Sequence, residues 1–334
     1  MVFRPDSSLL DLPDPEIDRE KINKMIIATR YSHDPVMVNE VIEHLALKPK
    51  SLIVDATIGG GGHAKEILSK HNNIKLLGID QDAEAIEAAR KNLEAFGDRI
   101  ELIQDNFSNI KSIIGSRGSK VNGILFDLGI SSYQIDTPQR GFSFQADAPL
   151  DMRMDISKEV TAKDLINNSE RESLENIIKN YGEERYYRRI VTAIIKKRPV
   201  STTLELARIV KYSIPRTSPL NATKSTARVF QAFRIAVNNE LDNLKKALNG
   251  SIDILAPKGR IVVISYHSLE DRIVKDLFRT GATGCICPPR LPKCVCSHKK
   301  MLKIITKKPM TPNDREMNDN PRSRSAKLRA AEKI

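Results

Sequence analysis

The chain has 334 residues, enough for about two domains, and its 40% apolar content is sufficient for an ordinary buried core. Its 54 lysines and arginines exceed its 42 acidic residues, and the formal net charge of +12 favours an anionic partner such as nucleic acid. No apolar run approaches the ~18 residues of a membrane span, and the first 30 residues carry six acidic side chains, which disfavours membrane anchors, secretory signals and transit peptides.

The first predicted elements are an N-terminal arm and a helix. Residues 1–30 are polar, include three closely spaced prolines and show no sustained periodicity, which predicts a loosely ordered arm without chemistry. From Pro35 onward, apolar residues recur at helical spacing until the segment ends at Lys48 and Pro49.

Strands and helices then alternate along the chain. The predicted strands are short apolar runs at residues 52–54, 74–79, 100–103 and 121–126. Between them, a glycine turn at 59–62 leads into a helix over 64–70, and an Ala- and Glu-rich helix covers 83–96. This order indicates a parallel sheet with crossover helices, and therefore a doubly wound α/β fold.

The alternation stops near Ser131, where a long helical pattern with proline-containing loops begins. Sheet pattern returns strongly over 260–265, after a Pro-Lys-Gly turn, and more weakly over 302–306. We therefore predict a main domain in two segments, 31–135 and 245–334, interrupted by a helical insertion over 136–244. Such an insertion commonly forms a substrate-recognition lobe beside a cleft at the carboxyl ends of the strands.

The glycine turn after the first strand has the composition of a ligand-binding loop. Its glycines allow backbone N–H groups to approach a ligand closely, and the helix N-terminus that follows favours a carboxylate or phosphate. Gly59, Gly61 and Ala64 also satisfy the dinucleotide pattern G-x-G-x-x-G/A, with Asp80 at the distance expected for a ribose contact. A turn without any ligand remains an alternative.

Aspartates end the four early strands: Asp55, Asp80, Asp105 and Asp127. Adjacent strands of one sheet would gather these carboxylates along one rim, where they could address an ammonium, ribose hydroxyls and an adenine amino group. Those groups belong to S-adenosylmethionine, whereas carboxylates would repel the pyrophosphate of NAD. For Asp82 and Asp105, a turn-forming or helix-capping role is an equal alternative.

Seven motifs occur in the order of one known family. They read DATIGGGGH (55–63), DLGISS (127–132), RGFSF (140–144), PLDMRM (149–154), YGEER (181–185), SYHSLEDR (265–272) and NPRSRS (320–325). From about Tyr31 to its C-terminus the chain resembles the RsmH or MraW family of small-subunit ribosomal RNA cytosine-N4-methyltransferases. The first 30 residues fall outside this resemblance.

The resemblance implies a Rossmann-like class I methyltransferase fold with a helical insertion. It also implies methyl transfer from S-adenosylmethionine to N4 of a cytosine in the decoding region of small-subunit ribosomal RNA. Carried over position by position, the family's cofactor contacts fall on Gly61, Gly62, His63, Asp80, Phe107, Asp127 and Gln134. Two positions depart mildly from the family, since Gly60 often carries a side chain in relatives and Tyr266 is more often Phe.

Cytosine N4 is a poor nucleophile because its lone pair is delocalised into the ring. Its placement against the methyl group and an acceptor for an N4 hydrogen would therefore assist transfer. Asp127 and Ser131 occupy the chain position of the acidic or amide motif in other amino-methylating enzymes, and Asp151 is a second candidate. We take Asp127 as the catalytic candidate, and its full engagement by adenine as an equal alternative.

Other side chains are expected near the same cleft. His267 and Glu270 follow the late strand, although a purely structural role suits His267 equally well. An aromatic side chain over the site would stack on a flipped-out cytosine, because an enzyme that acts on a base must free it from its neighbours. The candidates are Tyr133, Phe142 and Phe144, and core packing is the expected fate of at least one phenylalanine.

Basic residues cluster in two regions suited to RNA phosphates. From Ser297 onward, eleven basic residues face four acidic ones. The residues of this tail suited to phosphate contacts are Arg322, Arg324, Lys327 and Arg329. A second cluster on the insertion comprises Arg185, Arg188, Arg189, Lys196, Lys197 and Arg198. A solvated charged face is the alternative to an RNA-binding surface.

All four cysteines lie in one short stretch, as the pairs Cys285/Cys287 and Cys294/Cys296. They cannot form a disulfide framework spread through the fold, so a reducing cytoplasm is the simplest compartment. Four thiolates, with His298 nearby, could hold zinc, but the C-x-C spacing is tighter than the usual C-x-x-C and the family's reaction needs no metal. We assign no metal site at this point, and reduced thiols or a reversible redox clip remain open.

The sequence therefore predicts a cytoplasmic, S-adenosylmethionine-dependent methyltransferase that acts on small-subunit ribosomal RNA within the small ribosomal subunit. It leaves the oligomeric state open, with a homodimer as one option, and assigns no membrane partner. An NAD-dependent oxidoreductase rests on the glycine motif alone and predicts nicotinamide binding. A non-catalytic RNA-binding or assembly factor predicts RNA affinity without methyl transfer, and the intact acids and glycines argue against it.

Overall fold

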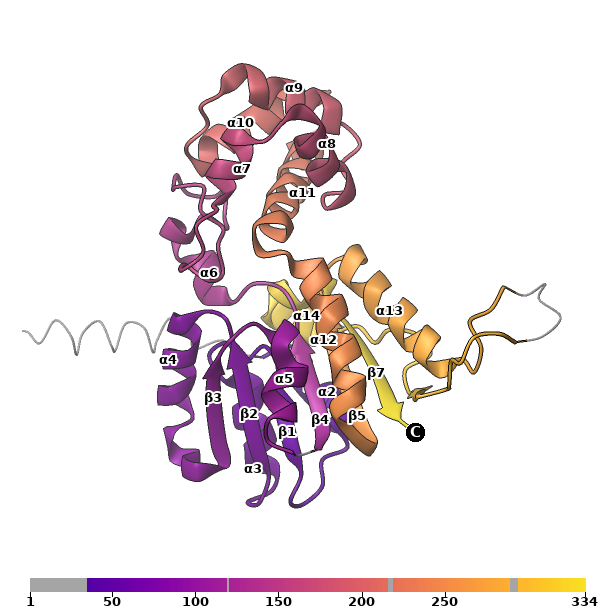
Figure 1. Ribbon diagram of the computed structural model, residues 1–334. Coiled ribbons are helices and arrows are strands. Elements are labelled where there is room, and N and C mark those ends of the chain that lie inside the picture. Colours follow the sequence, from indigo (N-terminus) through magenta and orange to yellow (C-terminus); the bar gives the residue numbers. More distant parts are fainter. Residues whose placement is uncertain (1–34, 119, 216–218, 289–293) are drawn as a thin grey trace, which may run out of the picture.

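Seven strands form one mixed sheet at the centre of the molecule (Figure 1). The computed structural model describes residues 35–118, 120–215, 219–288 and 294–334, so the arm predicted over residues 1–30 lies outside the described residues. In chain order the strands are β1 (Leu52–Asp55), β2 (Lys75–Asp80), β3 (Ile100–Gln104), β4 (Val121–Asp127), β5 (Leu255–Ser265), β6 (Leu302–Ile304) and β7 (Lys327–Lys333). The strands predicted before residue 130 are all present, with their ends shifted by at most one residue.

The strand order across the sheet is β3-β2-β1-β4-β5-β7-β6. Strands β1 to β5 pair in parallel, whereas β7 runs antiparallel to both β5 and β6. The chain winds outward from β1 to β3 and then returns to β4 on the other side of β1. The order thus reverses between β1 and β4, at the topological switch point where open α/β sheets bind ligands. The predicted Rossmann-like α/β fold is confirmed.

Helices cover both faces of the sheet, and successive residues of β1 enter opposite cores, with Ile53 in one and Val54 in the other. The helices on the Ile53 side are α2 (Val38–Leu45), α3 (Gly62–Lys70) and α4 (Ala83–Asn92), and those on the Val54 side are α5 (Ile110–Gly115), α12 (Glu240–Ile254) and α13 (Ser268–Ala282). Because both faces are buried, the strands are nearly continuous apolar runs, which made them recognisable in the sequence.

Shorter elements connect these layers. They are η1 (Glu94–Arg99), η2 (Phe107–Asn109), α6 (Ser132–Asp136), η3 (Pro138–Arg140), α14 (Asp314–Asp319) and η4 (Pro321–Ser325). The helix predicted over 83–96 is divided, since α4 ends at Asn92 and the 3-10 turn η1 begins at Glu94. None of the helices in the described ranges has both the length and the apolar character that a membrane crossing requires.

A helical lobe stands above the carboxyl ends of the parallel strands (Figure 1). Its helices are α7 (Ala162–Asn168), α8 (Arg171–Asn180), α9 (Tyr187–Lys197), α10 (Thr203–Ser213) and α11 (Pro219–Asn238). They share an apolar core of their own, which includes Ile166, Ile178, Val191 and Phe233 and is separate from the two cores of the sheet. The next helix, α12, leads from the lobe back to the sheet, so residue 244, where we predicted the insertion to end, lies inside a helix.

The C-terminal strands differ from the sequence prediction. Strand β6 ends at Ile304, two residues before the predicted end, and β7 was not predicted at all. Lysine and glutamate surround the buried centre of β7, so its sequence reads as a basic tail. Arg329 is buried in this strand and donates to both carboxylate oxygens of Asp271, at 2.6 and 3.1 Å. It is therefore not available for the phosphate contact that we predicted.

Candidate functional site

A cavity of about 380 Å³ lies at the switch point, where β1, β2, β4 and β5 end. Six of the seven predicted cofactor contacts line it: Gly62, His63, Asp80, Phe107, Asp127 and Gln134. Gly61 does not line it. Residues of α11 and α12 contribute to its lining as well, so the helical lobe and the sheet both contribute to one hollow.

The glycine turn brings backbone to the edge of this cavity. Gly59 and Gly61 have positive φ angles, +50° and +85°, which glycine adopts without the steric cost of a side chain. A Cβ atom on Gly61 would also come within 2.9 Å of the Leu93 side chain. Gly61 therefore gives the turn its shape as the N-cap of α3, while Gly60 and Gly62 face the cavity.

The aspartates at the strand ends divide into two groups. Asp80 lines the cavity and accepts the backbone N–H groups of Gly59 and Asp82, each at 3.0 Å. Burial raises the pKa of Asp80 to about 6. Asp82 caps α4 through the N–H of Glu84, and Asp105 accepts from Asn109 in the turn after β3. Neither Asp82 nor Asp105 lines the cavity, so the capping and turn-forming alternative holds for both.

Asp127 is fixed at the end of β4 by contacts from three other segments. Its Oδ1 accepts the Tyr266 hydroxyl at 2.8 Å, and its backbone N–H donates to Thr57 Oγ1 at 2.7 Å. His63 Nε2 lies 3.4 Å from Asp127 Oδ2. Burial and the neighbouring Asp127 hold the pKa of Tyr266 well above 10, so this hydroxyl keeps its proton and donates it. The carboxylate therefore has a defined orientation at the cavity wall.

His63 is buried between two carboxyl groups, Asp127 at the cavity and Asp55 beneath it. Burial lowers the pKa of His63, but Asp127 and Asp55 outweigh that effect and leave it above its ordinary 6.5. Burial raises the pKa of Asp55 from 3.8 to about 7. Asp55 ends its strand as expected, but it does not line the cavity and instead belongs to the layer that supports it.

Phe107, Ser131 and Gln134 form another part of the wall. The Phe107 ring packs edge-on against Phe126, with centroids 5.9 Å apart, and is thereby held in place. Ser131 and Gln134 form a capping box at the start of α6, and the Gln134 amide also donates to Asp82 at 2.8 Å. Ser131, a candidate acceptor for an N4 hydrogen, is thus occupied as a helix cap.

Arg140 of the RGFSF motif connects the lobe to the sheet. Its guanidinium is buried and pairs with Asp82 at 2.9 Å and with Glu84 at 2.7 Å. It also donates to the backbone carbonyls of Arg153 and Met154, at 3.1 and 3.0 Å. One planar side chain with several donors therefore ties the PLDMRM segment to the start of α4.

Of the two residues after β5 that we expected at the cavity, Glu270 lines it and His267 does not. Glu270 lines the cavity and accepts the backbone N–H of Tyr266 at 2.9 Å. His267 caps α13, does not line the cavity, and has Nε2 3.1 Å from Glu270 Oε1. Burial raises the pKa of Glu270, but His267 and Arg234 outweigh this and lower it. The structural alternative for His267 is supported by this capping role.

Sequence reasoning did not identify the cavity residues that come from α11 and α12. They are Arg234, Asn238, Glu240, Asn243 and Leu244. Arg234 makes a bidentate pair with Glu240 at 2.9 Å, and Asn238 bridges Met152 O and Met154 N, each at 2.8 Å. Arg234 and Asn238 are four residues apart in the last, mostly apolar turns of α11, and a polar pair at that spacing was the available signal.

Other candidates lie elsewhere. Asp151 is outside the cavity lining and makes a bidentate pair with Arg153, at 2.8 Å for both contacts. Phe142 belongs to the lobe core, and Phe144 packs on Phe230 with centroids 5.2 Å apart. Tyr133 lines the cavity, with its hydroxyl donating to Glu84. The expectation that at least one phenylalanine would pack in a core is met.

The basic cluster on the insertion is largely exposed. Its exposed members are Arg185, Arg188, Arg189, Lys196 and Lys197. Arg198 is half-buried and donates to the carbonyls of Ile166 and Ser169 within the lobe. In the tail, Arg324 is exposed, and Arg322 lines the cavity while pairing with Asp136 at 2.6 Å.

The chain is similar along most of its length to proteins of one family. Residues 30–334 match the model of the MraW methylase family. The chain is 49% identical over 309 residues to the ribosomal RNA small subunit methyltransferase H of Finegoldia magna, covering 91% of this chain and 99% of that protein. It is 50% identical over 309 residues to the protein of the same name from Carboxydothermus hydrogenoformans, covering 91% and 98%.

Proposed function

The chain belongs to the MraW methylase family, and from this premise we propose that it methylates N4 of a cytosine in the decoding region of small-subunit ribosomal RNA. Its methyl donor is S-adenosylmethionine. The observation that carries the proposal is the convergence of Asp80, Asp127 and the glycine turn around one cavity at the switch point of the sheet.

The chemistry of the cavity suits this cofactor. Phe107 and Leu128 offer apolar surface to a purine, and the Asp80 carboxylate at the end of β2 suits ribose hydroxyls. Asp127 adds a second acceptor on the same wall. The volume of about 380 Å³ falls in the range typical of small-molecule sites. Carboxylates in these positions would repel the pyrophosphate of a nicotinamide dinucleotide.

We assign the seven predicted contacts accordingly. Gly62 and His63, in the first turn of α3, contact the cofactor. Gly61 is the N-cap of α3, and its positive φ gives the glycine turn its conformation. Asp80 holds the ribose and Phe107 packs against the adenine. The remaining assigned contacts are Gln134 and Asp127.

When bound, the cofactor would supply a methyl group on a sulfonium. Cytosine N4 would attack the methyl carbon in line, so the N–C bond forms as the C–S bond breaks, S-adenosylhomocysteine leaves and the N4 proton passes to solvent. Asp127 orients the cytosine amino group by accepting one of its hydrogens. Tyr266 and His63 occupy one position on each oxygen, and a carboxylate has about four acceptor positions, so about two remain for the substrate. Tyr266 and His63 hold this carboxylate in place, which limits the reorganisation needed during transfer.

The lobe and the tail provide the RNA-binding surface in this proposal. We propose the division into a main domain (31–135 and 245–334) and a recognition insertion (136–244), because the lobe has its own core and borders the cavity. The exposed arginines and lysines of α9 and its preceding loop are suited to phosphates. We further propose that the RNA is methylated in the cytoplasm within the small subunit.

Mass mapping of methylated cytosine in small-subunit ribosomal RNA tests the function. RNA from cells that lack the protein should lack one N4-methylcytosine, and a plasmid copy of the gene should restore it. An unchanged map would refute the proposal, and methylation on carbon or on ribose oxygen would refute the target atom. Calorimetric titration with S-adenosylhomocysteine should show binding, whereas nicotinamide dinucleotides should not bind.

A further inference from the structure

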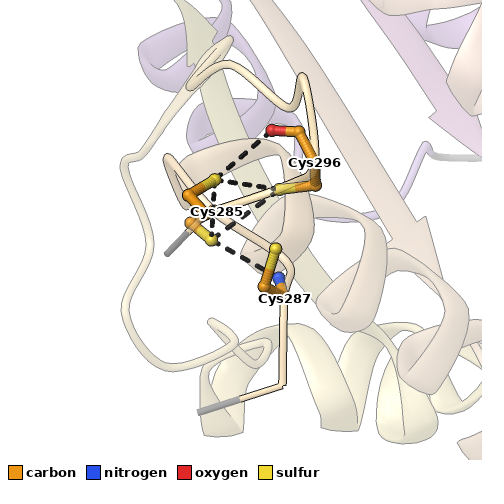
Figure 2. Close-up of side chains that lie close together, drawn as sticks. Cys285, Cys287 and Cys296 are labelled. Carbon is orange, nitrogen blue, oxygen red and sulfur yellow. Dashed lines mark hydrogen bonds between the residues drawn. The ribbon is translucent and has the colours of Figure 1, made fainter. Parts of the chain in front are cut away.

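The four cysteines of the chain gather at a place that the methylation site does not use. They lie between α13 and β6, in a segment that projects away from the sheet (Figure 1). Figure 2 shows the thiol groups of this segment pointing toward one another. All four sulfur atoms lie within 4.8 Å of one another. None of these cysteines lines the cavity at the switch point.

Three of the six sulfur–sulfur distances match the edges of a tetrahedron around one ion, and the others are at most 4.8 Å. Cys294 Sγ lies 3.5 Å from Cys285 Sγ and 3.6 Å from Cys296 Sγ, and the sulfurs of Cys285 and Cys296 are 3.7 Å apart. Four Zn–S bonds of about 2.3 Å in tetrahedral geometry place the sulfurs about 3.8 Å apart. A disulfide would need about 2.05 Å, and all four cysteines are free.

Backbone N–H groups also point at these sulfur atoms. Ile286 donates to Cys296 Sγ and Val295 donates to Cys287 Sγ, each at 3.4 Å. The middle residue of each C-x-C pair therefore donates to a sulfur of the other pair. Cys287 adds a third such contact, to Cys285 Sγ at 3.4 Å. Donors directed at sulfur favour the thiolate, which is the form that binds a metal, and they orient it.

Among the described residues of this segment, burial of the side chains inside the two pairs does not account for the convergence. Ile286 is 55% exposed and Val295 is 78% exposed, so the middle residue of neither pair is buried. Ordering such a loop costs conformational entropy, and a metal bound by both pairs would offset that cost. His298 is not part of the cluster, because its Nε2 contacts the Thr280 carbonyl at 2.9 Å.

We propose that Cys285, Cys287, Cys294 and Cys296 bind one Zn²⁺ ion. Each thiol releases its proton to solvent as its Zn–S bond forms, and no oxidation state changes. Four protein ligands leave no coordination position open, so the ion is structural and takes no part in methyl transfer. It fixes the segment between α13 and β6. A cluster of several irons would hold the thiolates farther apart than these sulfurs are, which favours a single ion.

Metal analysis of the full-length protein, purified without chelator, tests this proposal. Mass spectrometry of the metal content should find one zinc ion per chain, and the double variant Cys285→Ser/Cys296→Ser should contain none. Ser297→Ala and His298→Ala serve as matched controls in the same segment, and both should retain the ion. Loss of zinc from His298→Ala would overturn the four-thiolate ligand set.

If the double variant fails to fold, a second measurement on folded protein still tests the zinc site. Wild-type protein reconstituted with Co²⁺ should show the intense sulfur-to-cobalt absorption of a tetrahedral thiolate site, and Cys287→Ser should weaken that absorption. Metal-free protein with four titratable thiols, a disulfide detected by mass, or iron in place of zinc would each overturn the proposal. Cofactor binding is measured separately, so failure of the zinc site would leave the proposed methylation untouched.

Discussion

The cavity at the switch point and the cysteine segment both gather polar side chains, but by different means. His63, Asp127 and Tyr266 come from distant parts of the chain, and the sheet with its connecting loops brings them together. The cysteines are close neighbours in sequence, and the described apolar residues inside their two pairs, Ile286 and Val295, are exposed. Packing preorganises the first group, whereas the second needs an ion to keep its geometry. The two sites should therefore respond independently to substitution.

The largest expected effect comes from Asp127→Ala. Removal of the acceptor at the cavity wall should lower the methylation rate at saturating cofactor by at least about 100-fold, the size typical for loss of one preorganised catalytic group. The rate is measured by transfer of labelled methyl groups to small-subunit RNA, and zinc content should not change. Asp253→Ala, on an exposed carboxylate that pairs with Lys111, is the control. If the variant binds the cofactor more weakly but keeps the wild-type methylation rate at saturating cofactor, Asp127 acts only in cofactor binding.

Asp80→Asn should act on cofactor affinity. Loss of the charged acceptor for the ribose hydroxyls should weaken binding of S-adenosylhomocysteine by about 10- to 100-fold, the equivalent of one hydrogen bond to a charged group. Because the pKa of Asp80 is about 6, affinity in the wild type should fall as the pH drops below that value. Calorimetry at several pH values measures both effects.

Asp105→Asn is the matched control for Asp80→Asn, since Asp105 also ends a strand but does not line the cavity. Equal losses in the two variants would mean that neither carboxylate contacts the cofactor directly.

Tyr266→Phe should have a smaller effect on the same site. It removes one hydrogen bond to Asp127 and keeps the ring, so the methylation rate should fall by about fivefold, equivalent to about 1 kcal/mol. Steady-state kinetics at saturating cofactor measure it, and Tyr212→Phe on the exposed surface is the control. A loss as large as that of Asp127→Ala would make the Tyr266 hydroxyl part of the chemistry itself.

Asp55→Asn should change the pH dependence of stability rather than activity. The pKa of Asp55 is 3.8 when unfolded and about 7 when folded, so the folded state retains a proton that the unfolded state loses between these values. Its contribution to stability is present below pH 3.8 and is lost as the pH rises through 7. Asparagine mimics the protonated acid, so the variant should gain stability relative to wild type from pH 5 to pH 8. A constant difference in denaturant midpoints across that range would contradict the raised pKa.

Much of the sheet was predictable because its strands are local apolar runs. Strands β1, β2 and β4 are nearly continuous apolar runs because both faces of the sheet are covered there, whereas the edge strand β3 is only partly buried and carries the exposed Glu101. The lysines and the glutamate of β7 make its sequence look polar. Leu328 and Ala330 are buried only because β5 and β6 flank that strand. The pairing of Arg329 with Asp271 was hidden for the same reason.

Sequence alone determined the family, the order of the strands up to β4 and six residues of the cavity wall, because glycines and aspartates at strand ends are local signals. Tertiary structure decided which aspartate faces the cavity, since Asp80 and Asp105 look alike in sequence and differ only in what surrounds them. It also decided that Arg234 and Tyr266 belong to the site, and that the two cysteine pairs face each other. Sequence spacing gives the separation of two residues along the chain, whereas their separation in space depends on how the helices and strands pack.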